Sequence, residues 1–324
     1  MKKAKTIALT VLALLLAFEL LAPRVVPRWR HRVRIDSTLG WINLPNAVIT
    51  RPNADDVPWT FAINSKGFRG PENWNADAKT RILVIGDSFA FGEGIAIEDR
   101  FDTILSRRHP EWSFVNLSVG GWGTDQELIA SRSMRSQLRA RDVLLIVTCW
   151  NDLYDLSRRV YAGRAKPWFE LSGDRLVEHA PAFGVVSYLR DKLYLAGALA
   201  VLRERATRFS PETLRASLCL YERLLASETR EVAERGAFVV IAHFQDRQFA
   251  DQAGLKVQEL EVVFDRLCAA ANVHCVSLDS EPDGPIQSSM YQRDEHWNAS
   301  GDRAVASVLE RHLGNLLRAA TPAP

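Results

Sequence analysis

Residues 81–88 read Arg81-Ile82-Leu83-Val84-Ile85-Gly86-Asp87-Ser88, a short apolar run that ends in a glycine, an acid and a serine. Four aliphatic residues before a turn predict a buried β-strand. In an open α/β sheet, chemistry is placed just beyond the carboxyl ends of the strands. Ser88 is therefore a candidate nucleophile, provided that the rest of the chain supplies a sheet and a base.

Beyond Arg81 the sequence alternates between strand-like and helix-like segments, which is the pattern of a parallel sheet. The expected strands cover residues 82–85, 113–117, 143–148, 237–242 and 273–278. Helical periodicity covers residues 100–108, 125–138, 211–235, 256–271 and 300–317. The unbroken apolar run at 143–147 indicates a strand that is covered on both faces. We therefore expect an α/β domain with a five-stranded parallel sheet.

Four short polar segments follow predicted strands or precede the last predicted helix. They are Gly86-Asp87-Ser88, Gly120-Gly121-Trp122-Gly123-Thr124, Cys149-Trp150-Asn151-Asp152 and Asp294-Glu295-His296-Trp297-Asn298. Because the carboxyl ends of parallel strands share one edge of the sheet, we expect the four segments to meet in space.

These segments contain the groups that acyl transfer requires. Ser88 would attack a carbonyl carbon, His296 would accept its proton, and Asp294 would orient the imidazole. The backbone N–H groups of Ser88 and Gly121, with the side-chain amide of Asn151, would form the oxyanion hole. The sequence thus predicts a catalytic triad of Ser88, Asp294 and His296.

The arrangement resembles the SGNH (GDSL-type) hydrolase superfamily over about residues 81–319. The resemblance implies a flavodoxin-like three-layer α/β/α sandwich and serine esterase activity, with Ser88, Gly121, Asn151 and His296 in the positions that name the family. Cys149 stands where the third block of the family usually has glycine. The Asp-x-His-Trp spacing replaces the common Asp-x-x-His and resembles carbohydrate O-acetyl-modifying members.

Several neighbours of these residues have structural interpretations. We expect Asp87 to serve as a hydrogen-bonding residue, Asp152 to brace its loop, and Asn298 to cap the last helix. The tryptophans beside three of the blocks are expected to pack in the core, with platforms for sugar rings as the alternative; they are Trp122, Trp150 and Trp297. The histidines and cysteines outside the blocks show no ligand spacing, so neither a metal nor a cofactor is expected.

The first 34 residues differ in charge from the rest of the chain. They hold eight of the 41 basic residues but only one of the 39 acidic residues, Glu19, so the remainder is net negative and shows no basic stripe for nucleic acid. An apolar run at 7–22 after three lysines indicates a membrane segment over 1–23, followed by a basic linker over 24–34.

The fate of that segment determines where the protein acts. Leu20-Leu21-Ala22-Pro23 is a poor cleavage site, so a retained anchor is favoured over a removed signal peptide, with a buried core helix as a further alternative. The arginines after the run weigh against export. We expect a single-pass anchor in the inner membrane and a periplasmic catalytic domain.

Two segments surround the predicted catalytic domain. Residues 35–80 are interpreted as a small β-rich appendage, with a hairpin at 60–69 that has Gly67 at positive φ. Residues 152–209 are too long for a simple crossover and are expected to form a lid with a hairpin near 169–177 and a helix near 188–208. Free buried thiols are favoured for the cysteines, although a bridge between Cys268 and Cys275 is conceivable.

The leading functional hypothesis is a serine esterase that removes acyl groups, probably acetyl, from an exported or envelope carbohydrate through an acyl-Ser88 intermediate. The alternatives are an O-acetyltransferase that acylates a polysaccharide, a lysophospholipase or other lipid esterase, and a non-catalytic carbohydrate-binding module. The acyl group and the acceptor are left open by the sequence.

Overall fold

A five-stranded parallel sheet forms the centre of the protein, in the strand order β13-β12-β7-β5-β6. The computed structural model describes residues 2–25, 33–149, 151–185, 188, 193–206, 211–244, 257–278 and 287–319. The strands are β5 (Thr80–Ile85), β6 (Trp112–Asn116), β7 (Val143–Cys149), β12 (Phe238–Phe244) and β13 (Val273–Ser277). All five lie where the sequence predicts them, within two residues at each end.

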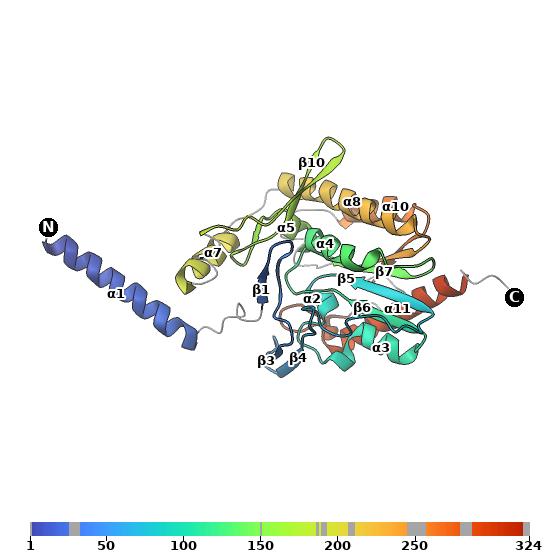
Figure 1. The fold of residues 1–324 in the computed structure, drawn as a ribbon, viewed down its shortest axis with the longest axis horizontal. Helices are drawn as coiled ribbons and strands as arrows, with labels where there is room; N and C mark the ends of the chain where they lie inside the picture. Colours follow the sequence, from blue (N-terminus) through green and yellow to red (C-terminus); the bar gives the residue numbers. More distant parts are fainter. Residues whose placement is uncertain are drawn as a thin grey trace.

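Helices cover both faces of the sheet, so the predicted three-layer α/β/α sandwich is confirmed (Figure 1). One face carries α4 (Thr124–Arg135), α8 (Pro211–Ala233) and α10 (Val257–Cys268), and the other carries α3 (Phe101–Arg108) and α11 (Ala299–Ala319). Leu83 and Ile85 pack into the first layer while Ile82 and Val84 pack into the second, as alternating side chains of a strand must. The residues of β7 are buried on both sides, because this strand lies at the middle of the sheet.

The N-terminal region forms two short hairpins that lie beside the sheet. One pairs β1 (Val33–Asp36) with β2 (Gly40–Asn43), and the other pairs β3 (Val48–Pro52) with β4 (Pro58–Ala62). The prediction of a hairpin at 60–69 is therefore wrong, because the strand at its start, β4, pairs with β3, which precedes it in the sequence. Residues 64–68 form a tight turn instead, in which Asn64 Oδ1 accepts the N–H groups of Lys66 and Phe68. Gly67 does have positive φ, as predicted.

The segment after β7 contains short elements. These are α5 (Asn151–Leu156), the β8 (Val160–Tyr161) and β9 (Arg164–Ala165) pair, the hairpin of β10 (Trp168–Ser172) and β11 (Arg175–His179), and α7 (Tyr194–Ala206). The β10–β11 hairpin matches the prediction. Of the helix expected near 188–208, the structure describes helical residues at Tyr188 and in α7, whereas Leu193 between them is not helical.

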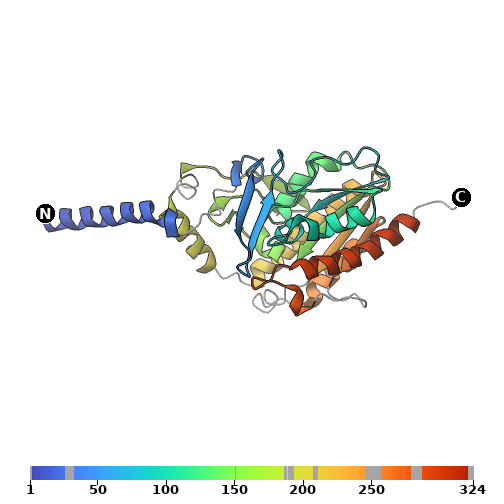
Figure 2. The same ribbon diagram turned by 90° about the horizontal axis from the view of Figure 1, so that it is seen from below.

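The first helix, α1 (Lys2–Val25), projects away from the sandwich (Figures 1 and 2). Residues Lys5–Ala22 within it are long and apolar enough to cross a membrane, and their side chains are almost all exposed. The C-terminal part of α1 contacts α7. This contact links the N-terminal helix to the segment inserted after β7.

The cysteines differ in part from the expectation of free buried thiols. Cys268 at the end of α10 and Cys275 in β13 form a disulfide, with their Cα atoms 5.8 Å apart. The turn between the helix and the strand returns the chain upon itself and brings the two residues within bonding range. Cys149 and Cys219 are not part of a disulfide; Cys149 is buried and Cys219 is exposed.

Candidate active site

The carboxyl edge of the sheet brings the four polar segments together. Ser88 begins α2 (Ser88–Phe91) directly after β5, Gly121 follows β6, and Asn151 begins α5 after β7. His296 lies in the loop that precedes α11. Segments more than 200 residues apart in sequence are thus neighbours in space, because parallel strands end at a common edge.

Gly86 allows the chain to turn from β5 into the helix that presents Ser88. A Cβ at this position would lie 2.7 Å from the Cβ of Ala90 and 2.9 Å from the carbonyl oxygen of Val147 on the neighbouring strand. Asp87 then caps α2, since its Oδ1 accepts the N–H of Phe89 at 2.9 Å. The Gly-Asp-Ser motif is therefore a compact strand-to-helix turn that exposes the serine.

The side chains of Ser88 and His296 are in hydrogen-bond contact. His296 Nε2 lies 2.8 Å from Ser88 Oγ, and the imidazole rests against the ring of Phe89 with centroids 5.0 Å apart. Packing against Phe89 holds the ring in place while 22% of the histidine side chain stays exposed. This geometry suits transfer of the hydroxyl proton to the imidazole.

Asp294 lies on the opposite side of the imidazole. Its Oδ2 is 3.0 Å from His296 Nδ1, although the N–H of that nitrogen is not well aligned on the oxygen. Glu295 between the two residues has φ +71°, a left-handed conformation that is unusual for a residue other than glycine. This turn lets the short Asp-x-His spacing bring the carboxylate back onto the ring.

The two groups shift each other's pKa in opposite directions. Burial lowers the pKa of His296, but the hydrogen bond and charge of Asp294, with Glu93 and Asp87, outweigh it, so the pKa is raised overall. Burial raises the pKa of Asp294, but the hydrogen bond and charge of His296 lower it overall. The pair therefore favours a carboxylate beside a histidine that accepts protons readily.

Asn151 is held in a defined orientation by its neighbours. Its Nδ2 donates to Asp87 Oδ2 at 2.6 Å, and its Oδ1 accepts a hydrogen bond from Cys149 Sγ. Cys149, which replaces the usual glycine, thus contacts the amide directly. Asp87 has the hydrogen-bonding role expected of it. Among the described residues the amide nitrogen has one acceptor, Asp87, so its second N–H could reach a ligand, as an oxyanion donor requires.

Asp152 braces the loop that follows β7, as expected. Its Oδ2 accepts hydrogen bonds from Thr148 Oγ1 at 2.7 Å and from the N–H of Cys149 at 3.1 Å. Burial and the neighbouring charge of Asp87 raise the pKa of Asp152 to about 7. Asn298 caps α11 in the predicted way, since its Oδ1 accepts the N–H of Ser300 at 2.9 Å.

Gly121 lies against an aromatic ring from the inserted segment. It has φ +76°, and a Cβ there would lie 2.5 Å from Tyr161. Only glycine fits this position without displacing the ring or straining the backbone. Tyr161 in turn stacks on the buried Trp41, with centroids 5.7 Å apart. The inserted segment therefore forms part of the wall of the candidate site.

A cavity of about 310 Å³ opens over Ser88 and His296. Gly121 and Tyr161 line one side of it, and an ion pair between Arg51 and Glu93 lines another. Arg51 comes from β3, so the N-terminal hairpins contribute to the site. The motif search did not find Arg51, Glu93 or Tyr161, because their places on the cavity depend on contacts across the whole chain.

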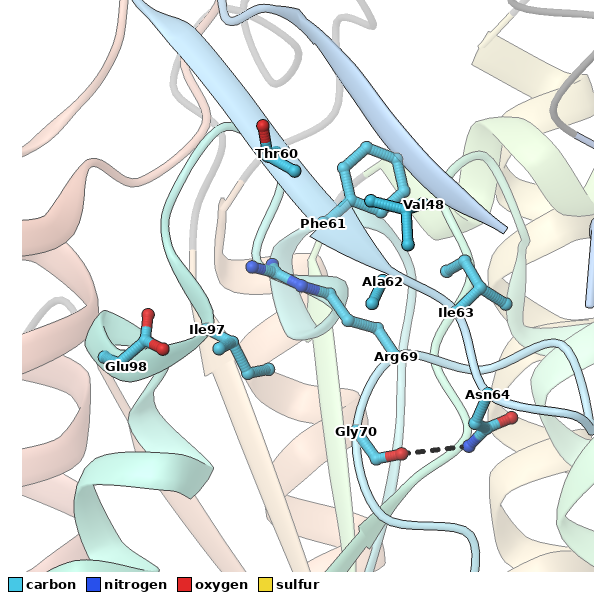
Figure 3. Close-up of a pocket in the computed structure, with 10 residues that line it drawn as sticks. All are labelled: Val48, Thr60, Phe61, Ala62, Ile63, Asn64, Arg69, Gly70, Ile97 and Glu98. Carbon is cyan, nitrogen blue, oxygen red and sulfur yellow. Dashed lines mark hydrogen bonds between the residues drawn. The ribbon is translucent and has the colours of Figure 1, made fainter. Parts of the chain in front are cut away.

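Another cavity, of about 450 Å³, is lined by residues of the β3–β4 hairpin and by Arg69 (Figure 3). Phe61 lines both cavities, and Arg69 extends beneath the second. The guanidinium of Arg69 donates to the carbonyl oxygens of Phe91, the last residue of α2, and of Gly92 and Ile95 in the loop after it. The N-terminal region thus supports the loop beside the candidate nucleophile.

Gln292 connects the histidine loop to the serine helix, and sequence analysis did not identify it. Its Nε2 donates to the carbonyl oxygens of Glu93 and Trp297, both at 2.8 Å. Its backbone N–H donates to the carbonyl oxygen of His296 at 2.7 Å. The side chain is almost fully buried, and no sequence motif marks it.

The tryptophans near the motifs are core residues where the structure describes them. Trp122 is fully buried and donates to the carbonyl oxygen of Trp41, while Trp297 is buried between Phe89 and Phe244. Neither is available to stack on a sugar ring. Trp150, the third tryptophan considered for that role, lies outside the described residues. Among the described residues no group of three potential metal ligands occurs.

No protein-family model and no curated protein matches the chain. Several solved structures are similar to it at low identity. TesA is 15% identical, with 73% of this chain and 99% of that chain covered and a TM-score of 0.45. The acetyl xylan esterase Est2A from Butyrivibrio proteoclasticus is 10% identical, with 77% and 66% covered and a TM-score of 0.43. An extracellular lipase from Streptomyces rimosus is 13% identical, with 72% and 99% covered and a TM-score of 0.43.

Proposed function

We propose that the protein is an SGNH-type serine enzyme that transfers acyl groups from esters, with Ser88, His296 and Asp294 as its triad. The observation that carries the proposal is the 2.8 Å contact between Ser88 Oγ and His296 Nε2 in an open cavity, with Asp294 3.0 Å from the other ring nitrogen. A serine becomes an effective nucleophile when such a base accepts its proton.

In the proposed reaction, Ser88 Oγ bonds to the acyl carbon while the carbonyl electron pair moves onto its oxygen. The hydroxyl proton passes to His296 Nε2. When the intermediate collapses, the bond to the alcohol breaks and the departing oxygen takes the proton from Nε2, which leaves Ser88 acylated. Water or a second hydroxyl then attacks the acyl carbon by the same route and restores the free serine.

The charged intermediate needs hydrogen-bond donors at its oxygen. The N–H groups of Ser88 and Gly121 and the side-chain amide of Asn151 are the donors that we assign to it. The contacts of Asn151 with Asp87 and Cys149 support this role, because a donor that is already oriented needs no rearrangement during the reaction. Loss of one such donor lowers kcat by about 10²–10³-fold in well-studied hydrolases.

The size of the cavity favours a short acyl group such as acetyl over a long fatty acyl chain, since about 310 Å³ must also hold part of the alcohol. We assign the alcohol to a carbohydrate of the cell envelope or an exported polysaccharide. Hydrolysis and transfer to a sugar hydroxyl share the same acyl-enzyme. Products formed from an acetylated donor with and without an oligosaccharide acceptor distinguish the two.

The proposed location is the periplasmic side of the inner membrane, with α1 as a retained anchor. The disulfide between Cys268 and Cys275 supports an oxidising compartment, because such bonds rarely persist in a reducing cytosol. A reporter fused after Pro324 that is active only in an oxidising compartment tests this assignment. Activity of a matched cytosolic reporter fusion in its place would contradict it.

The chemical proposal is tested with p-nitrophenyl acetate and a fluorophosphonate probe. The full-length protein is expected to hydrolyse the ester and to be labelled at Ser88, while Ser88→Ala and His296→Ala lose both signals. Ser307→Ala is the matched control, because this half-buried serine on α11 donates to the carbonyl oxygen of Arg303 one turn earlier in the same helix. A wild-type protein that neither hydrolyses the ester nor reacts with the probe would favour a carbohydrate-binding module instead.

The dependence of the rate on pH provides a separate test. His296 must be neutral to accept the proton of Ser88, and its pKa is raised. We expect kcat/KM to rise with pH through this raised pKa and to reach a plateau above it. Asp294→Asn should move the inflection to lower pH, because it removes the charge that raises the pKa. A profile that stays flat to acid pH would contradict the assignment of the base.

A further inference from the structure

Glu19 of α1 is bound by the first turn of α7. Its two carboxylate oxygens accept the backbone N–H groups of Tyr194, at 2.7 Å, and Leu195, at 2.8 Å. The first N–H groups of a helix have no partner within the helix, and a negative charge there is favoured by the helix dipole. The first turn of α7 therefore supplies hydrogen-bond donors to the Glu19 carboxylate. The carboxylate in turn supplies acceptors and a negative charge to the N-terminus of α7.

This contact explains an acidic residue in an otherwise apolar segment. Glu19 lies within Lys5–Ala22, the stretch of α1 that is long enough to cross a membrane. A carboxylate near hydrocarbon is costly unless hydrogen-bond donors satisfy it. A signal peptide that is removed after export would gain nothing from a partner located 175 residues later in the mature chain. The contact thus supports a retained α1.

The segment that includes α7 exposes apolar side chains. Leu199 and Leu202, one helical turn apart on α7, are 57% and 62% exposed, and Val185 before the helix is 75% exposed. Phe183, Tyr188 and Leu193 are also exposed large hydrophobic residues. Exposed large apolar side chains that gather on one segment mark an interaction site.

We propose that α7, together with Phe183, Val185, Tyr188 and Leu193, forms a membrane-docking surface that lies on the bilayer spanned by α1. The inference rests on the proposed anchoring of the protein through α1. The bilayer is the chosen occupant because Glu19 attaches α7 to the membrane-length helix itself, near its C-terminal end. Both views show α7 beside that end of α1 (Figures 1 and 2).

The charges around this surface fit the same occupant. In the sequence, Arg203 and Arg205 flank Glu204 near the end of α7, and residues 24–34 contain five arginines and no acidic residue. Basic residues beside an apolar surface are attracted to anionic lipid headgroups. An apolar helix with basic neighbours is typical of helices that lie in the membrane interface.

Docking through α7 would place the candidate active site close to the bilayer. Val33, which lines the cavity over Ser88, follows the last residue of α1 by only eight positions. Eight residues span at most about 28 Å even when fully extended. The enzyme would therefore act on esters presented near the membrane surface, such as glycans still attached to a lipid or emerging at the membrane.

The experiment measures the depth of three positions in the full-length protein, reconstituted in nanodiscs of phosphatidylethanolamine and phosphatidylglycerol. Cys219→Ser first removes the exposed free thiol. Leu199→Cys, Leu12→Cys and Leu171→Cys are then labelled separately with an environment-sensitive dye, and quenching by spin-labelled lipids is recorded. Position 12 tests whether α1 is inserted in the bilayer. Leu171, a partly exposed leucine in the β10–β11 hairpin, is the control position outside the proposed surface.

The proposal predicts a blue-shifted emission and lipid quenching at position 199, quenching at 12, and no quenching at 171. Quenching at 12 without quenching at 199 would overturn the docking surface while leaving the anchor intact. Absence of quenching at both 12 and 199 would overturn the anchor as well. Hydrolysis of p-nitrophenyl acetate by the same samples reports separately on the proposed chemistry.

A second variant tests the contact that attaches α7. Glu19→Leu makes the span more apolar, so α1 is expected to stay inserted and position 12 to stay quenched. Quenching at 199 should fall, because the first turn of α7 loses its acceptor. Glu19→Gln keeps an acceptor oxygen and should retain more of the quenching than Glu19→Leu. Unchanged quenching at 199 in Glu19→Leu would overturn the role assigned to this residue.

Discussion

Gln292 shows how one buried side chain can hold two segments of the candidate site in register. Its amide bridges the carbonyl oxygens of Glu93 and Trp297, so the end of the serine helix and the histidine loop share a donor. Since misplacement of reacting groups by about 1 Å lowers rates by about 10²-fold, Gln292→Leu should reduce kcat by about that factor and leave KM nearly unchanged. Gln137→Leu, on an exposed glutamine, is the control.

A fall in kcat with a nearly unchanged KM would identify Gln292 as a positioning residue. A structural role alone would lower the melting temperature and the fraction of active enzyme, but would leave kcat per active site unchanged. Titration of active sites with a fluorophosphonate separates the two effects. An unchanged kcat per labelled serine would contradict the role.

Glu295 stores conformational strain between the two partners of the proposed triad. At φ +71°, a β-branched residue is strongly disfavoured, whereas glycine is not. We expect Glu295→Gly to keep activity near that of the wild type and Glu295→Val to destabilise the loop by about 1–3 kcal/mol with a marked loss of kcat. Thermal unfolding and ester hydrolysis measure both. Equal behaviour of the two variants would show that the backbone conformation is not required.

At the scale of elements, the N-terminal hairpins support the helix that presents Ser88. Arg69 binds three carbonyl oxygens in the 91–95 loop, and burial, with the nearby Arg100, lowers its pKa to about 9, so it is still charged at neutral pH. Arg69→Met should destabilise the protein by about 3 kcal/mol in urea unfolding, because buried carbonyl oxygens lose their donors.

The same substitution should lower activity, since the released loop adjoins the candidate nucleophile. Arg34→Met, on a strand residue that is exposed, is the matched control and should leave both stability and activity near wild type. If Arg69→Met loses stability but keeps full activity per folded molecule, then Arg69 stabilises the fold without supporting the candidate site.

At the scale of the whole molecule, buried carboxyl groups make stability depend on pH. Burial is the largest cause of the raised pKa values of Asp152 and Glu228, both about 7, and of Asp302, about 8. In the unfolded chain these groups ionise near pH 4. Between pH 4 and 8 the folded protein therefore binds more protons than the unfolded chain, and stability falls as pH rises.

We accordingly expect the free energy of unfolding in urea to be larger at pH 5.5 than at pH 8.5. Asp302→Asn should reduce the fall of the unfolding free energy toward pH 8.5, because asparagine still offers an acceptor to the N–H of Phe101 but cannot ionise. Asp77→Asn, on an exposed residue, should leave the slope unchanged. A free energy of unfolding that rises from pH 5.5 to pH 8.5 in the wild type would contradict the prediction.

The elements of the fold follow from local sequence patterns. Each predicted strand and helix of the sandwich lies close to its observed bounds, because side-chain periodicity is a property of neighbouring residues. The prediction of a hairpin at 60–69 is wrong because strand pairing is not a local property. The sequence of β4 is strand-like, but its partner is β3, which precedes it, and strand propensity does not determine which strands pair.

The sequence by itself determined the class of fold, the four motif segments and the residue types suited to acyl transfer, because these depend on spacing along the chain. Tertiary structure alone decided the sheet order, the 2.8 Å approach of His296 to Ser88, the bridge made by Gln292 and the contact between Glu19 and α7. These features join residues far apart in sequence, and only the packing of the complete chain brings such residues together.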